Sequence, residues 1–467
     1  MQEKTIIGFG LVPYPRIVPA LFLQNYVVYA VKDTADLDVL RPHAKIFCLE
    51  EKFPKAAAKI HAASYLLGNY AFHAFLKSRR QPFHLLMHRT TEPIIQKLEE
   101  HKLDWLGNRP ESFQGVWLKT DFYKVLHAAQ LPYIETVRLG REEIAGKTFS
   151  EFNVKWQQPM VAYRVFPQTG MEQSPFILLD EDDWEDMRQT LSLDEKYSEI
   201  QISPIVRGIS LSMVGCVTHL GVLTSPLQLQ FHNVPEVLHG EDPSRLSFGQ
   251  DFGFCSWDDH IEKKAQEITE KVGEFLSTKG FHGIFGVDFL YNTEQQKIFA
   301  TECMPQFTED LHIYSLMTMA HNNVPPLEFF HIMATLGLKE KFDFAKANAQ
   351  LKKRFPASHI FLLQKGIETM PIPLRAGVYS FSPENRGLTY LREGAFPWDL
   401  KNESEFLMLD SMPRYQQKVI DNVPSLFKLI FPRSIAESSS KVKPDVGELI
   451  AMLSQALREE EGLTETQ

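Results

Sequence analysis

Residues 280–310 read GFHGIFGVDFLYNTEQQKIFATECMPQFTED, and this stretch decides the fold. Two largely apolar runs, 284–291 and 297–303, flank the polar sequence NTEQQ, which is typical of a β-hairpin with a five-residue loop. Each run carries one carboxylate, Asp288 in the first and Glu302 in the second. The hairpin therefore places two acidic side chains in strands that are otherwise apolar.

The two acids share one face of the hairpin if Tyr291 pairs with Lys297. Asp288 then lies opposite Ala300, and Glu302 is its diagonal neighbour at about 7–8 Å between Cα atoms. Two carboxylates at this spacing can reach one hard cation, and Mg²⁺ commonly takes one or two carboxylates together with phosphate oxygens and water. A register change of one residue would instead put the acids on opposite faces. Considered alone, Asp288 is more simply interpreted as a strand residue that is hydrogen-bonded in the core or exposed at the rim of the sheet, and Glu302 as a surface residue.

The composition is that of a large globular protein in a reducing compartment. Its 467 residues exceed the ~250–300 at which a single core stops growing, so two to four subdomains are expected. The 49 Lys and Arg against 59 Asp and Glu give a net charge of −10, which argues against duplex nucleic acid or an anionic membrane as the main partner. Four cysteines without a CxxC pair, and the lack of any run of 18 apolar residues, favour a cytoplasmic chain that spans no membrane.

Alternating strand and helix patterns divide the chain into four parts. Residues 1–115 alternate β-type runs with helical patterns, which predicts a parallel α/β domain. Residues 116–215 are expected to form a small α+β lobe, and residues 216–340 a larger lobe that contains the hairpin. Residues 341–467 are expected to form an accessory α+β region with a terminal helix. Apolar residues at steps of four and three predict an amphipathic helix that ends just before Gly280.

The pattern G-x-x-G-x-x-G-V-D-F at 280–289, the hairpin, and a Glu followed shortly by Pro resemble the metal-binding end of the ATP-grasp ligases. Upstream, residues 103–139 resemble the entry into the nucleotide-binding lobe of that superfamily, and Lys119 precedes Pro132 by thirteen positions, which matches its spacing. The resemblance covers residues 1 to about 335. It implies an ATP-grasp-like α/β fold, in which an N-terminal parallel α/β domain precedes two α+β lobes that hold a nucleotide between them.

The same resemblance implies ATP and Mg²⁺ as cofactors. Carried over to this sequence, it makes Lys119 a contact to the nucleotide phosphates, and Asp288 and Glu302 the ligands of Mg²⁺. The second family lysine falls at Tyr163, so the adjacent Arg164 becomes the implied phosphate contact and a candidate catalytic residue. A cation in these positions neutralises charge on the transferring phosphoryl group.

Several positions depart from the family pattern. The two acids that usually hold adenine and ribose fall at Ser203 and Ser210, which stay candidates for nucleotide binding. The asparagine and arginine that usually follow the metal-binding glutamate are Met304 and Gln306 here, and Gln306 stays a candidate catalytic residue. The usual glycine-rich loop shortens to residues 168–171.

The function that the resemblance implies is an ATP-dependent ligase. It would activate a small-molecule carboxylate as an acyl phosphate for attack by an amine or another nucleophile. The departures from the pattern favour an alternative, a catalytically reduced ATP-grasp protein that binds nucleotide or a small acid without ligating it. An unrelated α/β enzyme with a chance hairpin is a third reading.

The expected partners are small-molecule substrates, with no nucleic acid and no membrane, and homo-oligomerisation stays open. Strand alternation directs Cys303 to the face opposite Glu302, so a packed thiol is expected there. His312 is expected to be a histidine in a turn.

Overall fold

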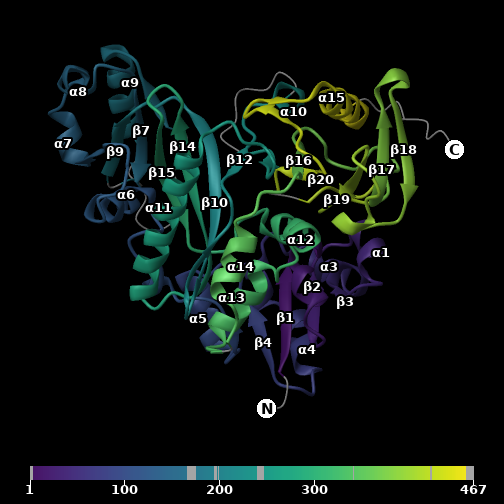
Figure 1. Ribbon diagram of the computed structural model, residues 1–467. Helices are drawn as coiled ribbons and strands as arrows, with labels where there is room; N and C mark the ends of the chain where they lie inside the picture. Colours follow the sequence, from purple (N-terminus) through teal and green to yellow (C-terminus); the bar gives the residue numbers. More distant parts are fainter. Residues whose placement is uncertain are drawn as a thin grey trace.

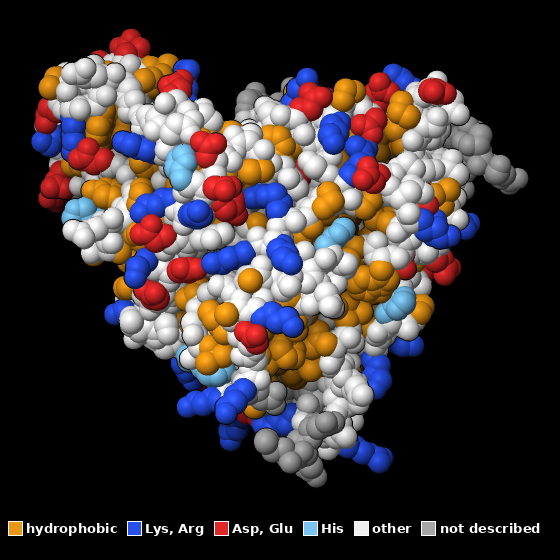
Figure 2. All heavy atoms as spheres, in the orientation of Figure 1, with side chains coloured by type: hydrophobic (Ala, Val, Ile, Leu, Met, Phe, Trp, Pro, Cys, Tyr) orange, Lys and Arg blue, Asp and Glu red, His pale blue; other side chains and the backbone are white. Residues whose placement is uncertain are grey.

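The computed structural model describes residues 4–165, 175–193, 197, 199–238, 247–339, 341–420 and 423–458 (Figure 1). The N-terminal domain lies at the bottom of this view, a small lobe at the upper left, and the C-terminal strands at the upper right. A notch separates the two upper parts and persists when all atoms are drawn (Figure 2). The expected short glycine loop at 168–171 lies outside the described residues.

A parallel sheet forms the N-terminal domain, as the alternating pattern predicts. Its strand order is β3-β2-β1-β4-β5, so the chain reverses direction across the sheet between β1 and β4. The strands are β1 (Thr5–Gly10), β2 (Tyr26–Ala30), β3 (Lys45–Cys48), β4 (Phe83–Leu86) and β5 (Trp105–Leu106). The helices are α1 (Asp36–Leu40), α2 (Leu49–Lys52), α3 (Pro54–Ala57), α4 (Tyr70–Lys77) and α5 (Glu92–Glu100), with a 3₁₀ segment, η3, at Ala63–Gly68. Both faces of the sheet are buried, as is usual for parallel strands.

The small lobe is an antiparallel sheet of four strands covered by helices. Its strand order is β6-β9-β7-β8. The strands are β6 (Val137–Gly140), β7 (Met160–Val165), β8 (Phe176–Leu178) and β9 (Glu199–Pro204). The helices are α7 (Arg141–Ala145), α8 (Phe149–Trp156) and α9 (Glu181–Ser192), and α6 (Lys119–Ala128) leads into the lobe. Trp184 is fully buried at the centre of this lobe's own core.

One antiparallel sheet of 11 strands links the large lobe to the C-terminal part of the chain. Its order is β15-β14-β10-β12-β13-β16-β20-β19-β17-β18, and β11 pairs with β10 outside this path. The strands are β10 (Ile209–Thr218), β11 (Gly221–Thr224), β12 (Gln228–Gln230), β13 (Gly249–Asp251), β14 (Gly283–Asn292), β15 (Lys297–Met304), β16 (Ser358–Leu363), β17 (Gly377–Ser382), β18 (Gly387–Arg392), β19 (Glu405–Leu409) and β20 (Ser425–Phe431). The helices are α10 (Pro235–Leu238), α11 (Asp259–Thr278), α12 (Leu311–Asn322), α13 (Leu327–Thr335), α14 (Phe344–Leu351) and α15 (Pro444–Arg458), and the strands β21 (Ala436–Ser438) and β22 (Lys441–Val442) form a separate ribbon.

The helix α11 covers one face of this sheet. Its apolar stripe of Ile261, Ala265, Ile268 and Val272 is buried, which confirms the amphipathic helix predicted from their spacing. Gly273 lets the helix approach the sheet closely, because a Cβ atom there would lie 3.0 Å from the ring of Phe285 and closer still to Val222. The opposite face of the same strands carries Asp288 and Glu302. Among the described helices, none is both long enough and apolar enough to cross a bilayer.

The structure places two of the expected divisions differently. β10 pairs with β14 from Ile209 onward, so a division at residue 215 would cut through a strand of the large lobe. Residues 341–467 continue the central sheet, because β13 pairs with β16, and they share its core. This part of the chain is therefore joined to the large lobe by a ladder of hydrogen bonds, and is not a separate accessory body.

Candidate functional site

A β-bulge in the β14–β15 hairpin brings the two acids face to face. Near the turn, Tyr291 pairs with Ile298, and not with Lys297 as the sequence analysis expected. If the Tyr291–Ile298 register continued along the whole hairpin, the two acids would lie on opposite faces. The register shifts between Asp288 and Phe289, however, so Asp288 lies directly opposite Glu302. Residues directly opposed across antiparallel strands share a face, and a bulge adds one residue to one strand. The extra residue is Thr301, and its hydroxyl donates to the Asp288 carbonyl oxygen at 3.2 Å.

Lys119 joins the two acids. It is the first residue of α6, which packs along β15, and its Nζ lies 2.9 Å from Glu302 Oε2. Burial and, to a lesser extent, the charge of Glu302 raise the pKa of Asp288 to about 7, against the opposing effects of Lys119 and a hydrogen bond from Gln230. Three residues chosen from the sequence, 14 or more positions apart, thus form one charged cluster.

Polar side chains from three neighbouring strands surround Asp288, and sequence reasoning missed them. Gln230 on β12 donates from Nε2 to Asp288 Oδ1 at 3.0 Å. Ser212 on β10 lies opposite Asp288 in the ladder, and Gln250 on β13 donates to its hydroxyl at 3.1 Å. The serine could have been found by strand alternation from Ser210. The two glutamines lie in three-residue strands that carry no motif.

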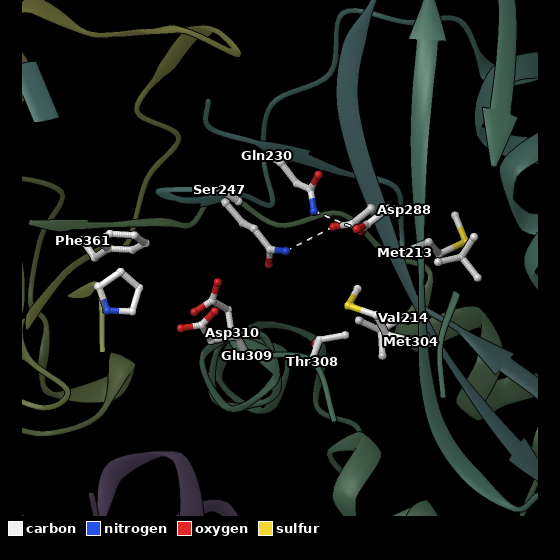
Figure 3. A pocket seen from close by; sticks show the side chains of 15 residues that line it. Met213, Val214, Gln230, Ser247, Asp288, Met304, Thr308, Glu309, Asp310 and Phe361 are labelled. Carbon is white, nitrogen blue, oxygen red and sulfur yellow. Dashed lines mark hydrogen bonds between the residues drawn. The ribbon is translucent and has the colours of Figure 1, made fainter. Parts of the chain in front are cut away.

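A cavity of about 170 Å³ borders these residues on the sheet face away from α11. Figure 3 shows Gln230 directed at Asp288, with the carboxylates of Glu309 and Asp310 on the wall across the space. Those two acids belong to the loop between β15 and α12. The wall from the C-terminal part includes Phe361 on β16.

Asp310 belongs to a buried network of charges behind this wall. Lys428 on β20 places Nζ 2.6 Å from Asp310 Oδ1 and 2.8 Å from Asp410 Oδ2. His312 Nε2 lies 2.9 Å from Asp410 Oδ2. Burial alone would raise the pKa of Asp310, but the ammonium group of Lys428 lowers it below its usual range. The expected turn histidine is thus a fully buried residue in the first turn of α12, and it does not line the cavity.

No family model matches the sequence, and no curated protein matches it significantly. Solved structures do match the fold. A biotin carboxylase from Campylobacter jejuni, solved as a β,γ-ATP complex, has a TM-score of 0.60 at 11% identity, over 92% of this chain and 87% of that chain. The N5-carboxyaminoimidazole synthase of Aspergillus clavatus, solved with ADP and 5-aminoimidazole ribonucleotide, has a TM-score of 0.54 at 12% identity, over 97% of this chain and 99% of that chain.

The biotin carboxylase domain of the Hydrogenobacter thermophilus 2-oxoglutarate carboxylase, solved with MgADP and bicarbonate, has a TM-score of 0.58 at 8% identity, over 92% of this chain and 86% of that chain. The chain has an ATP-grasp fold. This confirms the fold class predicted from the sequence, including the parallel N-terminal domain and the lobes that follow it.

Within the ATP-grasp fold, the two candidate serines lie on different lobes. Ser210 on β10 pairs with Leu290 and shares the sheet face of Ser212 and Asp288. Ser203 lies on β9 of the small lobe, opposite Val161, and is buried. The structure therefore brings Ser210 to the face that carries the acids, while Ser203 belongs to the opposing lobe.

Arg164 does not join the charged cluster. It pairs with Ile200 across β7 and β9, on the face that carries the small lobe's apolar core, and its guanidinium lies 4.6 Å from the centre of the Phe176 ring. The alternation of the strand puts Ser203 on the other face. The implied phosphate contact is therefore not supported by the orientation of Arg164.

Gln306 also lies away from the cavity lining. Its backbone N–H donates to the Met304 carbonyl at 2.8 Å in the tight turn that ends β15. Its side-chain Oε1 is buried and has no hydrogen-bond partner among the described residues. Cys303 pairs with Val287 and is buried on the opposite face from Glu302, which agrees with the packed thiol expected there.

Proposed function

We propose that this protein is an ATP-dependent ligase that activates a small-molecule carboxylate as an acyl phosphate. The proposal is supported chiefly by one observation, the meeting of Asp288, Glu302 and Lys119 beside a cavity in an ATP-grasp fold. The three solved structures compared above were obtained with ADP, MgADP or a β,γ-ATP ligand. We infer that ATP and Mg²⁺ are the cofactors of this chain too.

The donor set fits a magnesium ion. Asp288 and Glu302 offer carboxylate oxygens, the hard ligands that Mg²⁺ prefers, from directly opposed positions. Their mutual repulsion contributes to the raised pKa of Asp288, and a dication would relieve it. Groups of three or more His, Cys, Asp or Glu residues suited to a metal are not found in the described part of the chain, so phosphate oxygens and water would complete the shell. When bound, the ion would neutralise negative charge on the phosphates of the nucleotide.

Lys119 supplies positive charge at the same wall. Its ammonium group is paired with Glu302, and it lies in the first turn of α6, where the backbone amides are also partly positive. When a cation takes over the neutralisation of Glu302, the lysine can hold a phosphate oxygen. The fixed positions of these groups would orient the phosphate without a large rearrangement of the hairpin.

The acidic wall across the cavity favours an amine as the nucleophile. Glu309 and Asp310 both line this wall, and Lys428 keeps Asp310 ionised from behind. Negative charge here attracts a cationic group or a strong hydrogen-bond donor, and disfavours a second anion. A carboxylate that is activated near Asp288 would then meet an amine held by the opposite wall.

The test is ADP formation by the full chain with Mg-ATP and mixed pools of carboxylic acids and amines. We expect ADP release that requires both pools, and a loss of at least about 100-fold in Asp288→Asn and Glu302→Gln. Calorimetry should show Mg²⁺-dependent binding of ATP that weakens at least about tenfold in the same variants. Glu294→Gln is the matched control, because it makes the same change in the exposed turn of the same hairpin.

Two outcomes would contradict the ligase. Tight Mg-ATP binding without ADP release in any pool would point to the catalytically reduced ATP-grasp protein. ATP binding that is equal in wild type, Asp288→Asn and Glu302→Gln would remove the acid pair from the site altogether.

A further inference from the structure

The N-terminal domain contains a second cavity, of about 560 Å³, that the proposed ligase chemistry does not use. It lies at the carboxyl ends of β1 and β4, where Phe9 and Leu86 form part of its wall. The strand order β3-β2-β1-β4-β5 reverses between these two strands. In open parallel α/β sheets, ligands bind in the crevice at this point. None of the residues that line it also lines the cavity beside Asp288.

The charge of this cavity is positive, although the whole chain carries −10. Arg16, Arg89 and Lys97 line it, and no aspartate or glutamate does. His88 also lines it, but burial lowers the pKa of this histidine well below its usual value, so it adds no charge. Among the described residues, no carboxylate lies within ion-pair distance of Arg16, Arg89 or Lys97. Three cationic side chains around one space, without counter-ions from the chain, repel one another unless an anion lies between them.

Arg16 is held in place by the main chain. Its Nε donates to the Phe9 carbonyl at 3.0 Å, and Nη1 donates to the Pro15 carbonyl at 3.4 Å. Gly10 at the end of β1 leaves room for this arrangement, because a Cβ atom there would lie 3.0 Å from Arg16 Nε. Burial lowers the pKa of Arg16 to about 10, so the guanidinium remains charged at neutral pH. A fixed cation at the edge of the sheet is thus part of the wall.

The first turn of α5 also borders the cavity, through Thr91, Pro93 and Ile94. Thr91 is the N-cap, but its side chain does not accept a hydrogen bond from the helix, contrary to the usual role of threonine there. The N–H groups of Ile94 and Ile95 both donate to the Thr91 carbonyl, at 2.9 and 3.0 Å, and Pro93 has no N–H. The attraction for an anion therefore comes from the three cationic side chains and not from this helix.

The remaining wall is apolar and ends in an exposed aromatic ring. Met87 and Ile94 contribute apolar atoms to the wall, and Tyr65 at the 3₁₀ segment η3 is 57% exposed. The Lys97 ammonium lies 6.0 Å from the centre of the Tyr65 ring. An inorganic ion would leave this surface uncovered, whereas an organic body would cover it.

We propose that this cavity binds a small organic phosphate monoester, with the phosphate among Arg16, Arg89 and Lys97 and its organic part against Tyr65. A dianion matches three cations better than a singly charged carboxylate does. The site is independent of the ATP site. The proposal therefore stands or fails separately from the ligase function.

The test is calorimetry on the full chain carrying Lys119→Met, so that phosphates cannot use the ATP site. The probes are phenyl phosphate, inorganic phosphate, benzoate and phenol. We expect phenyl phosphate to bind most tightly, inorganic phosphate and benzoate more weakly, and phenol not at all. Lys97→Met and Arg89→Met, each added to this background, should weaken phenyl phosphate at least tenfold.

Lys77→Met and Arg80→Met are the matched controls, because both side chains are exposed in the same domain and outside the cavity. They should leave phenyl phosphate binding unchanged. Mg-ATP binding, measured with Lys119 intact, should be the same in Lys97→Met as in wild type, which shows that the variant is folded. Absence of phenyl phosphate binding, equal binding in all variants, or benzoate binding as tight as phenyl phosphate would each overturn the proposal.

Discussion

Replacing Lys428 by methionine should destabilise the protein strongly, because it removes the cation from a buried network. Lys428 is 5% exposed and contacts both Asp310 and Asp410, of which Asp410 is 1% exposed. The variant leaves two carboxylates facing each other without their shared cation. Breaking a buried pair by removing one partner costs about 3–5 kcal/mol.

The expected shift in melting temperature follows from the size of the chain. An unfolding entropy of about 2.1 cal/mol/K per residue gives roughly 1 kcal/mol/K for 467 residues, so the loss corresponds to at least about 3 °C. If fewer residues unfold together, the unfolding entropy is smaller and the melting temperature falls by more. The deficit should shrink as the pH falls toward 5, since a carboxylate without its cation has a raised pKa in the folded state and regains a proton there.

Calorimetric melting of Lys428→Met at pH 7.5 and pH 5 is the measurement. Lys401→Met, an exposed lysine in the C-terminal part of the chain, is the control, and its melting temperature should equal that of wild type. The double variant Lys428→Met with Asp410→Asn should recover part of the loss, because one of the unpaired charges is gone and the asparagine can still accept from His312. Wild-type melting in Lys428→Met, or a double variant less stable than the single one, would refute the reasoning.

Three further results are expected. Burial raises the pKa of Glu328 to about 7, so the folded protein binds a proton at this residue more tightly than the unfolded chain does. The free energy of unfolding should therefore fall as the pH rises from about 4.5 to 7. Glu328→Gln should reduce this pH dependence by about 3 kcal/mol in denaturant titrations at pH 5 and pH 8. A thiol reagent should modify one cysteine per native chain, Cys255, because it is exposed and the other three are buried; labelling of two or more native thiols would contradict the core packing. Gly8→Ala should cost about 1–3 kcal/mol, since its Cβ would lie 1.8 Å from the Tyr26 hydroxyl, whereas Gly68→Ala meets no atom within 4 Å and should be neutral in the same melting assay.

The sequence pointed to Asp288 and Glu302 together because both lie in one hairpin, whose apolar runs are a local signal. Lys119 was implied only by the resemblance of its spacing to Pro132 to the ATP-grasp pattern, and its contact with Glu302 was not predicted. The register was predicted wrongly by one residue, because a bulge such as that at Thr301 depends on how the strand meets its neighbours and has no sequence signature here. The acids nonetheless ended on one face, since the bulge compensates for the error.

Longer-range features could not be read from the sequence. Gln230 reaches Asp288 across the intervening strand β10, although the two residues are 58 positions apart in sequence. The orientation of Arg164 depends on the alternation of side chains along β7. A shift of one position moves a side chain from the face that carries the apolar core to the opposite face. The pairing of β13 with β16 joins segments more than 100 residues apart, so the C-terminal region looked like an accessory body when only local patterns were available.

The continuous sheet also constrains how the chain can be shortened. Removing residues 341–467 would strip β16 from β13 and leave the N–H and C=O groups of an inner strand exposed as a bare edge. Such an edge recruits strands from other molecules, so a truncated chain should precipitate on expression. It would also lose Phe361 and Pro424 from the cavity beside Asp288. The proposed nucleotide site therefore cannot be separated from the C-terminal strands by truncation at residue 341.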